Sequence, residues 1–177
     1  ARTAVVIGGG FIGVEVAENL VHLGMDVAVV EAADQVMAPI DPEMATPVHD
    51  RMRAHGVDLR LGSAVAAIGP HEVTLATGDT LYADVVIAAI GVRPETTLAE
   101  QAGLAIGERG GILVDDQLRT SDPDILAVGD AIEKTDAVDG TAALIPLANT
   151  ANLQGRRAAD VIAGRDPQLE RAVQAAL

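Results

Sequence analysis

Three glycines and one glutamate have the types and the spacing of a site for a pyrophosphate and a ribose. Gly8, Gly10 and Gly13 form a G-x-G-x-x-G pattern after an apolar run, and Glu31 follows a second apolar run. The glycines permit a tight turn, close approach to a pyrophosphate, and close packing of a helix on a strand. N–H groups at the helix start attract the pyrophosphate, and the carboxylate accepts hydrogen bonds from ribose hydroxyls. This pattern predicts a dinucleotide site; an α/β turn without a ligand is the alternative.

Glu31 also bears on the choice of dinucleotide. The 2′-phosphate of NADP(H) would meet a like charge at this position, and residues 32–34 contain no arginine to neutralise it. We therefore expect NAD(H) in preference to NADP(H). An arginine from elsewhere in the chain is the alternative that would admit the phosphate.

The elements that must position these residues alternate between strand and helix patterns. The first part of the chain predicts a strand from about residue 3, a helix over 11–23, a strand over 27–30, a helix over 41–55 and a strand over 57–61. Short runs at 63–68, 72–76 and 80–82 are separated by turn residues and predict an antiparallel meander in place of a crossover helix. A strand over 84–90 then brings Gly91 to the edge where open α/β sheets bind ligands. The fold class is α/β, a Rossmann-like dinucleotide-binding domain with a parallel sheet.

The second part of the chain predicts fewer and shorter elements. They are a helix over 97–102, turns over 107–111, strands over 112–114 and 125–128, a polar mobile segment over 133–141, a helix over 147–163 and a last helix over 166–177. Residues 112–177 are too few to form a sheet with two covered faces. We therefore expect them to complete a larger structure.

Composition excludes several classes of function. The net charge of −14 opposes binding to nucleic acid and to anionic membranes, and the aromatic residues are only Phe11 and Tyr82. No apolar run approaches the roughly 18 residues that span a bilayer, and we expect no signal peptide before the first strand. The chain has no cysteine, and its four histidines share no ligand spacing, so we expect no metal site and no redox thiol. These features are compatible with a cytoplasmic protein.

Several longer motifs point to one family. They are residues 8–15, 88–94, 111–115, 120–130 and 145–148 together with 154–156. In these motifs the chain resembles the flavin-dependent pyridine nucleotide–disulfide oxidoreductases, particularly the coenzyme A-disulfide reductase, NADH oxidase and NADH peroxidase branch. That family inserts its nicotinamide domain within its FAD domain. The resemblance therefore implies an NAD(H)-binding domain over 1–111 and an incomplete C-terminal portion of an FAD-binding domain over 112–177.

Three features of that family have no counterpart in this sequence. There is no upstream glycine motif for the FAD pyrophosphate, no redox cysteine and no downstream dimerisation domain. We therefore expect a piece of a larger enzyme that lacks half of its flavin domain and is inactive alone. The alternative is a highly reduced relative. The resemblance implies a homodimer for the complete enzyme.

The resemblance also implies roles near the flavin. Asp130, which follows Gly129, would accept a hydrogen bond from a ribityl hydroxyl of FAD; helix capping is the alternative. Leu147 and Ala148 stand at a helix start, where their N–H groups would face the pyrimidine edge of the flavin. Phe11 would be the aromatic gate that covers the flavin until nicotinamide displaces it; a core phenylalanine is the alternative.

Further residues would contact the nicotinamide half of the dinucleotide. Glu15 would lie one turn into the helix near the nicotinamide ring, with a solvated helix face as the alternative. Gly91 would let the nicotinamide ribose lie against the end of the strand over 84–90. Ile12 belongs to the same cofactor-binding turn as Phe11.

These expectations combine into one function and one alternative. The chain would be the NAD(H)-binding portion of an oxidoreductase that passes hydride to FAD and then to a disulfide, peroxide, oxygen or redox-partner acceptor. The alternative is a free-standing, non-catalytic NAD-binding sensor or interaction module.

Overall fold

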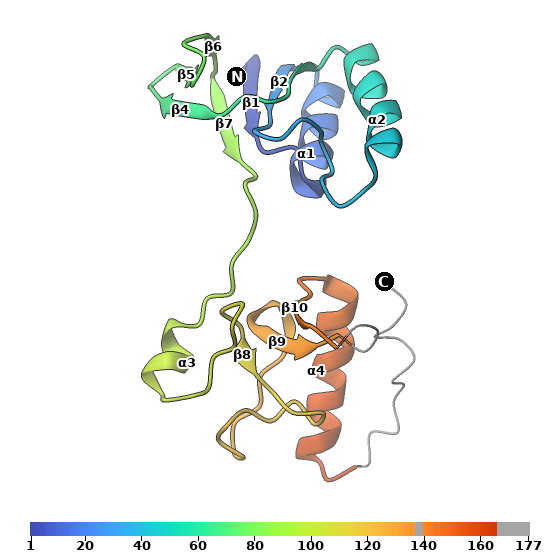
Figure 1. Ribbon diagram of the computed structural model, residues 1–177, viewed down its shortest axis with the longest axis vertical. Coiled ribbons are helices and arrows are strands. Elements are labelled where there is room, and N and C mark those ends of the chain that lie inside the picture. Colours follow the sequence, from blue (N-terminus) through green and yellow to red (C-terminus); the bar gives the residue numbers. More distant parts are fainter. Residues whose placement is uncertain (137–139, 166–177) are drawn as a thin grey trace. The chain divides into compact units, whose positions relative to one another are not determined.

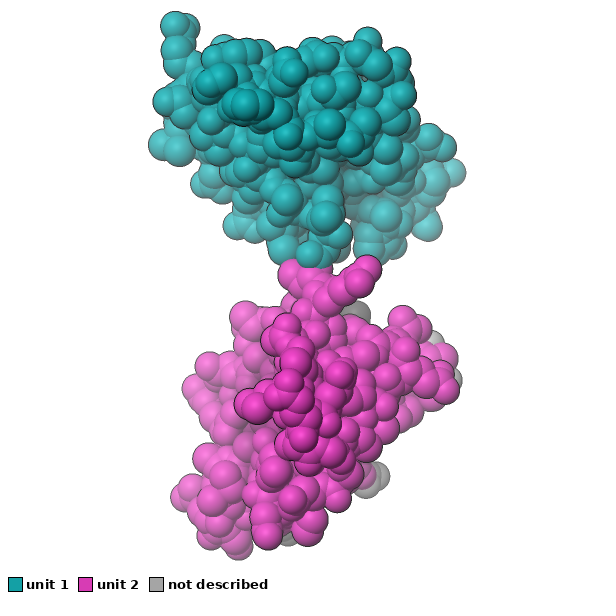
Figure 2. Space-filling model, turned by 90° about the vertical axis from the view of Figure 1, so that its left-hand side faces the viewer, with its two compact units in different colours: residues 1–91 teal, residues 92–177 magenta. Residues whose placement is uncertain are grey.

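The chain forms two compact units. The computed structural model describes residues 1–136 and 140–165. The first unit contains residues 1–91 and the second contains residues 92–177 (Figure 2). The sequence had placed residues 92–111 with the first unit, whereas they pack within the second. Assignment of the units to nicotinamide and flavin remains a prediction.

A four-stranded parallel sheet forms the centre of the first unit. Its order is β3-β2-β1-β7, and every neighbouring pair is parallel (Figure 1). The bounds are β1 Thr3–Ile7, β2 Asp26–Val30, β3 Asp58–Arg60 and β7 Val85–Ala88. Valines dominate β1 and β2, as expected for parallel strands that are covered on both faces.

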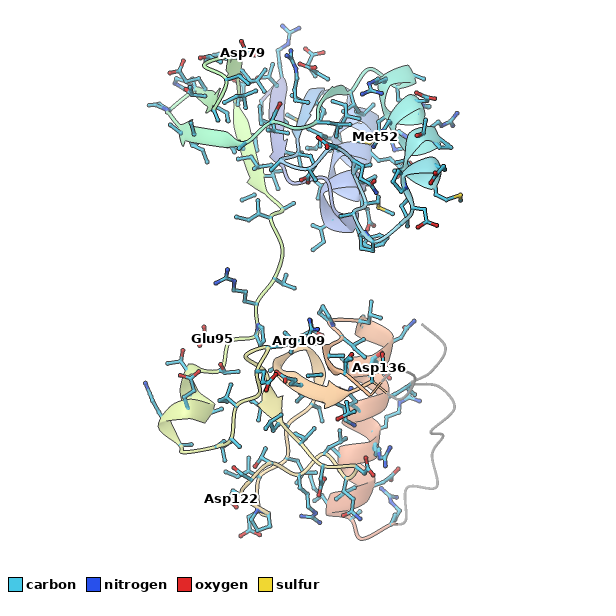
Figure 3. The ribbon with its side chains drawn as sticks, viewed as in Figure 1. Met52, Asp79, Glu95, Arg109, Asp122 and Asp136 are labelled. Carbon is cyan, nitrogen blue, oxygen red and sulfur yellow. The ribbon has the colours of Figure 1, made fainter. Side chains whose placement is uncertain are left out.

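Successive residues of the central strands pack on opposite sides of the sheet. Val6 and Val29 form one core with Ala17 and Met52, which come from the helices α1 and α2. Met52 is labelled in Figure 3. The bounds are α1 Phe11–His22 and α2 Pro42–Ala54. Side chains alternate along a strand, so the neighbouring residues of β1 and β2 face away from both helices.

The antiparallel meander predicted from the sequence covers the other face. Its strands are β4 Val65–Ile68, β5 Glu72–Leu75 and β6 Thr80–Tyr82, in the order β4-β5-β6. Val73 and Leu75 of β5 pack against Val5 and Val30 of the parallel sheet. The parallel sheet is therefore enclosed by helices on one side and by the meander on the other (Figure 1).

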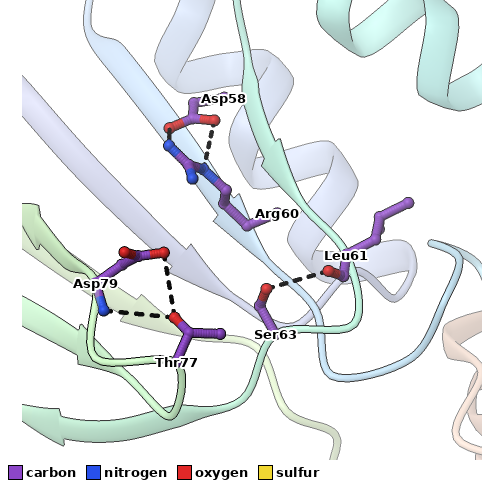
Figure 4. Close-up of polar contacts among 6 residues, drawn as sticks. All are labelled: Asp58, Arg60, Leu61, Ser63, Thr77 and Asp79. Carbon is purple, nitrogen blue, oxygen red and sulfur yellow. Dashed lines mark hydrogen bonds and ion pairs between the residues drawn. The ribbon is translucent and has the colours of Figure 1, made fainter.

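Polar contacts close the turns beside the meander. The Thr77 hydroxyl donates to Asp79 at 3.2 Å, and the Ser63 hydroxyl donates to the Leu61 carbonyl at 3.1 Å (Figure 4). Arg60 pairs with Asp58 at 2.8 Å. Both side chains of this ion pair are more than 40% exposed, so it contributes little to stability.

The second unit has a small sheet and one long helix. The sheet order is β10-β9-β8, with β8 Ile112–Leu113, β9 Ile132–Thr135 and β10 Ala142–Leu144. The helices are α3 Thr97–Gln101, the 3-10 turn η1 Gly129–Ala131 and α4 Ala148–Ile162. Leu118, Ile132 and Ala158 form the buried core.

A buried carboxylate anchors one loop of this unit. Glu133 on β9 is 2% exposed and accepts hydrogen bonds from the N–H groups of Arg109 at 2.8 Å and Gly111 at 3.3 Å. A Cβ on Gly107 would collide with the Glu133 carboxylate. The loop that carries Arg109 (Figure 3) therefore closes around this acid.

Two expectations for this part of the chain were wrong. Residues 125–128 do not form a strand; Leu126 makes an isolated bridge with Arg119 across a turn. Residues 132–135 form strand β9, although the polar run from 133 had predicted a mobile segment. The last helix expected over 166–177 lies outside the described residues. Within those residues, no helix is long and apolar enough to cross a membrane.

Candidate functional site

Backbone crowding explains two of the three patterned glycines. Gly8 has a φ of +105°, and a Cβ there would collide with the carbonyl oxygen of Ala89. A Cβ on Gly13 would collide with the carbonyl oxygen of Gly8. A Cβ on Gly10 would meet nothing within 4 Å, so this glycine faces open space. Gly8 and Gly13 therefore bring strand and helix together, and Gly10 leaves the approach to the helix start clear.

No side chain among the described residues caps the start of α1. Gly10 is the N-cap; it makes no side-chain cap hydrogen bond, and the first turn contains no acidic residue. The first N–H groups of a helix lack intrahelical acceptors and carry about half a positive charge. This helix end can therefore receive an anionic group.

Glu31 lies directly after β2 and its carboxylate is held by two backbone amides. Gly9 N–H donates to Oε2 at 2.6 Å, and Ala33 N–H donates to Oε1 at 2.8 Å. A carboxylate oxygen accepts more than one hydrogen bond, so both oxygens keep acceptor capacity for another donor. The structure thus brings the acid to the glycine turn, as the sequence pattern predicts.

The sequence pattern does not reveal the contribution of Gly9, the middle residue that G-x-G leaves unspecified. A Cβ at this position would lie 2.9 Å from Cγ1 of Val36 and 3.2 Å from Oε2 of Glu31. The Gly9 carbonyl accepts the N–H of Met37 at 2.7 Å. Gly9 therefore joins the turn to the segment after β2. The run of three glycines was the available signal, since the pattern itself requires only the outer two.

The segment 32–40 after β2 is also attached to α2. Val36 is fully buried, and its N–H donates to Nε2 of His49 at 3.1 Å. Met37 has a φ of +56°, an uncommon conformation for a residue with a Cβ. The sequence shows no ligand spacing among the four histidines, and a lone histidine in a helix gives no sign of its backbone partner.

The remaining residues expected at the cofactor lie in the first turns of α1 and after β7. Phe11 and Ile12 are 60% and 55% exposed, so the alternative of a core phenylalanine is wrong. Glu15 is exposed on α1. Gly91 has a φ of +105° and follows β7, whose neighbour in the sheet is β1. Ile90 is 78% exposed, which adds apolar surface beside this end of the first unit.

The residues expected near a flavin, other than Phe11, lie in the second unit. Gly129 has a φ of +78° and donates its N–H to Oε1 of the buried Gln154 at 2.6 Å. Asp130 is exposed within η1, which makes no side-chain cap hydrogen bond. Leu147 is the N-cap of α4, and its N–H already donates to Ile145 O at 2.9 Å. Ala148 begins α4, so its amide lacks an intrahelical acceptor and is the one of the expected pair that can face a ligand.

A comparison with models of protein families identifies the family of the chain. The model of the pyridine nucleotide-disulphide oxidoreductases matches residues 1–155. The chain belongs to this family. Members of the family named among its relatives include a rubredoxin-NAD(+) reductase from Pseudomonas putida, 37% identical over 170 residues. That alignment covers 93% of this chain and 44% of the relative.

Solved structures of other family members have the same fold. The reduced CoADR-RHD of Bacillus anthracis is 50% identical with a TM-score of 0.91, and the match covers 96% of this chain and 31% of that one. An engineered water-forming NADPH oxidase, derived from the Lactobacillus brevis enzyme and bound to NADPH, is 31% identical with a TM-score of 0.82. That match covers 89% of this chain and 36% of the other. The chain thus spans less than half the length of these relatives.

Proposed function

We propose that the chain is the NAD(H)-binding portion of a flavin-dependent oxidoreductase that passes hydride from NADH to FAD. The observation that carries this proposal is the Glu31 carboxylate, which two backbone amides hold beside an uncapped helix start. The helix amides would bind the pyrophosphate, and Glu31 would accept hydrogen bonds from the adenosine ribose. Family membership supports the use of a nicotinamide and a flavin.

The chain's own residues would bind and orient the dinucleotide. When bound, the nicotinamide supplies the hydride and the flavin receives it. The open space beside Gly10 would admit the pyrophosphate. The exposed side chains of Phe11, Ile12 and Ile90 would offer an apolar surface to the nicotinamide. Positioning of the two reacting rings is the main contribution that a protein makes to such a transfer.

Residues of the second unit would form part of the flavin site. Asp130 is exposed and would accept a hydrogen bond from the ribityl chain, and the Ala148 amide at the start of α4 would face the pyrimidine edge. Gly129 would hold this turn through its bond to Gln154. We propose that the missing half of the flavin domain completes this site in the whole enzyme, which would be a homodimer.

NAD(H) is the proposed partner in preference to NADP(H). A 2′-phosphate would meet the negative charge of Glu31, whose carboxylate is held in place. In the engineered NADPH oxidase the substituted residues include a glycine and an aspartate, separated by the same number of positions as Gly13 and Glu31. The aspartate was replaced by alanine and the next residue by arginine. This parallel supports Glu31 as the residue that selects between the two dinucleotides.

Calorimetric titration tests the proposal on the chain itself. NADH should bind at neutral pH, and NADPH should bind at least about tenfold more weakly because of the like charge. Absence of NADH binding at millimolar concentration would refute the dinucleotide site. A yellow flavin spectrum with steady NADH oxidation by the purified chain would refute the need for the missing flavin half.

A further inference from the structure

The imidazole of His49 accepts a hydrogen bond that requires one protonation state. Its Nε2 accepts from the backbone N–H of Val36, at 3.1 Å, and a backbone N–H can act only as a donor. An imidazole nitrogen accepts only when it carries no proton itself. His49 is therefore neutral in this structure, with its single ring proton on Nδ1.

Val36 transmits this contact to the glycine turn. Its side chain is fully buried, and Cγ1 lies 2.9 Å from the position that a Cβ on Gly9 would occupy. The next residue, Met37, donates its N–H to the Gly9 carbonyl, and Gly9 N–H in turn donates to Oε2 of Glu31. A continuous series of contacts thus runs from His49 on α2 to the carboxylate proposed to hold the ribose.

The surroundings of His49 favour its neutral form. Burial is the largest cause that holds the pKa of His49 below its ordinary value; the charge of Arg53 acts in the same direction, and Asp50 opposes both. The two carboxylates in or directly before the segment 32–40, those of Glu31 and Asp34, have other neighbours than His49. Glu31 bonds two amides, and Oδ1 of Asp34 lies beside Gly62.

The helix α1 also faces α2 and adds one acid to consider. A cavity of about 530 Å³ lies between the two helices, and Glu18 and Arg51 both line it together with Val48. Glu18 is not among the charges that shift the His49 pKa. The imidazole therefore has no acid from α1 or from the segment 32–40 that would stabilise its charged form.

We propose that neutral His49 is a positioning residue for the adenosine half of the dinucleotide, and that its protonation weakens dinucleotide binding in mildly acid solution. The inference rests on the proposed function of the Glu31 site. A proton on Nε2 would set two donors against each other and leave the buried Val36 N–H without an acceptor. The segment 32–40 would then shift, and Gly9 and Glu31 would lose their present alignment.

NAD⁺ is the suitable probe, because it is stable in mild acid. For the unaltered chain we expect affinity to be level above about pH 7 and to fall by about two- to fivefold by about pH 5.5. His49→Gln places a non-titrating amide near the position of Nε2; it should bind NAD⁺ within about twofold of the unaltered chain at neutral pH, with a flat profile. His49→Leu removes the acceptor and should bind more weakly throughout. His22→Gln, at the end of α1, should keep the original profile.

A second measurement does not depend on any ligand. In NMR titrations the Val36 amide resonance should move with the same midpoint as the His49 imidazole, and that midpoint should lie below the ordinary histidine value. A Val36 amide that does not follow the imidazole would overturn the inference. So would an acid loss of NAD⁺ affinity that persists undiminished in His49→Gln. A chain that binds no NAD⁺ at neutral pH, with the amide still coupled to His49, would refute the dinucleotide site and with it the inferred effect on binding.

Discussion

Oε2 of Glu31 accepts a hydrogen bond from the N–H of Gly9 at 2.6 Å, so the acid after β2 is bonded to the turn after β1. These two residues follow neighbouring parallel strands, whose ends meet at one edge of the sheet. The bond orients the carboxylate before any ligand arrives. Orientation of this kind reduces the conformational entropy that binding would otherwise cost.

Glu31→Arg should reverse the preference between the two dinucleotides. It replaces a negative charge by a positive one where a 2′-phosphate would lie, so NADPH should gain relative to NADH by about tenfold or more. The measurement is the ratio of the two dissociation constants. Glu31→Gln is the matched control, because it removes the charge and keeps an acceptor; it should narrow the ratio without reversing it. If the ratio of the two dissociation constants is the same in the unaltered chain, Glu31→Arg and Glu31→Gln, then Glu31 is not the ribose ligand.

Gly13→Ala and Gly10→Ala should separate folding from binding. The added Cβ at position 13 collides with the Gly8 carbonyl, so Gly13→Ala should lower the free energy of unfolding by about 1–3 kcal/mol. Gly10→Ala adds its Cβ in open space and should leave unfolding nearly unchanged while it weakens NADH binding. Urea denaturation and calorimetry measure the two effects. Equal losses of stability in both variants would contradict this division.

Glu133→Leu should destabilise the second unit. Arg109 and Gly111 would lose the acceptor of their N–H groups, at a cost of about 1–3 kcal/mol in the free energy of unfolding. Glu133→Gln keeps an acceptor oxygen and should lose less. Hydrogen exchange of the Arg109 and Gly111 amides reports the local change. Unaltered protection of both amides in Glu133→Leu would show that the carboxylate does not hold this loop.

Sequence periodicity predicted the first unit well because its elements have clear apolar patterns. The valine runs of β1 and β2 produced buried parallel strands, and turn residues separated the three strands of the meander. The predicted strand over 125–128 failed for a physical reason. Residues 125–127 do pair with residues 118–120, through Thr120 N–H to Ile125 O and Ala127 N–H to Leu118 O. The pairing is limited to one bridge because Leu118 turns away with a φ of +66° and a 3-10 turn begins at Gly129.

The sequence did not predict the hydrogen bonds that Glu133 makes in the second unit or the bond between Val36 and His49 beside the glycine turn. Glu133 is buried although it begins a polar run, because a loop more than twenty residues earlier supplies its amide donors. The bond from Val36 to His49 likewise joins a loop to a helix through a backbone amide. Spacing patterns record side-chain types, and they carry no signal for a backbone donor. The glycines and Glu31 could be found because their spacing is set by one strand–helix–strand unit.

The histidine at position 49 should also make stability depend on pH. Its pKa is lowered in the fold, chiefly by burial, so on acidification the unfolded chain takes up this proton first. The contribution of His49 to stability is therefore complete above the ordinary histidine pKa of about 6.5 and decreases as the pH falls from there toward the lowered value. Urea denaturation at about pH 7.5 and about pH 5.5 should show a larger acid loss in the unaltered chain than in His49→Gln. The same loss in both would mean that other groups account for it, and that the imidazole is not held neutral by Val36 and its surroundings.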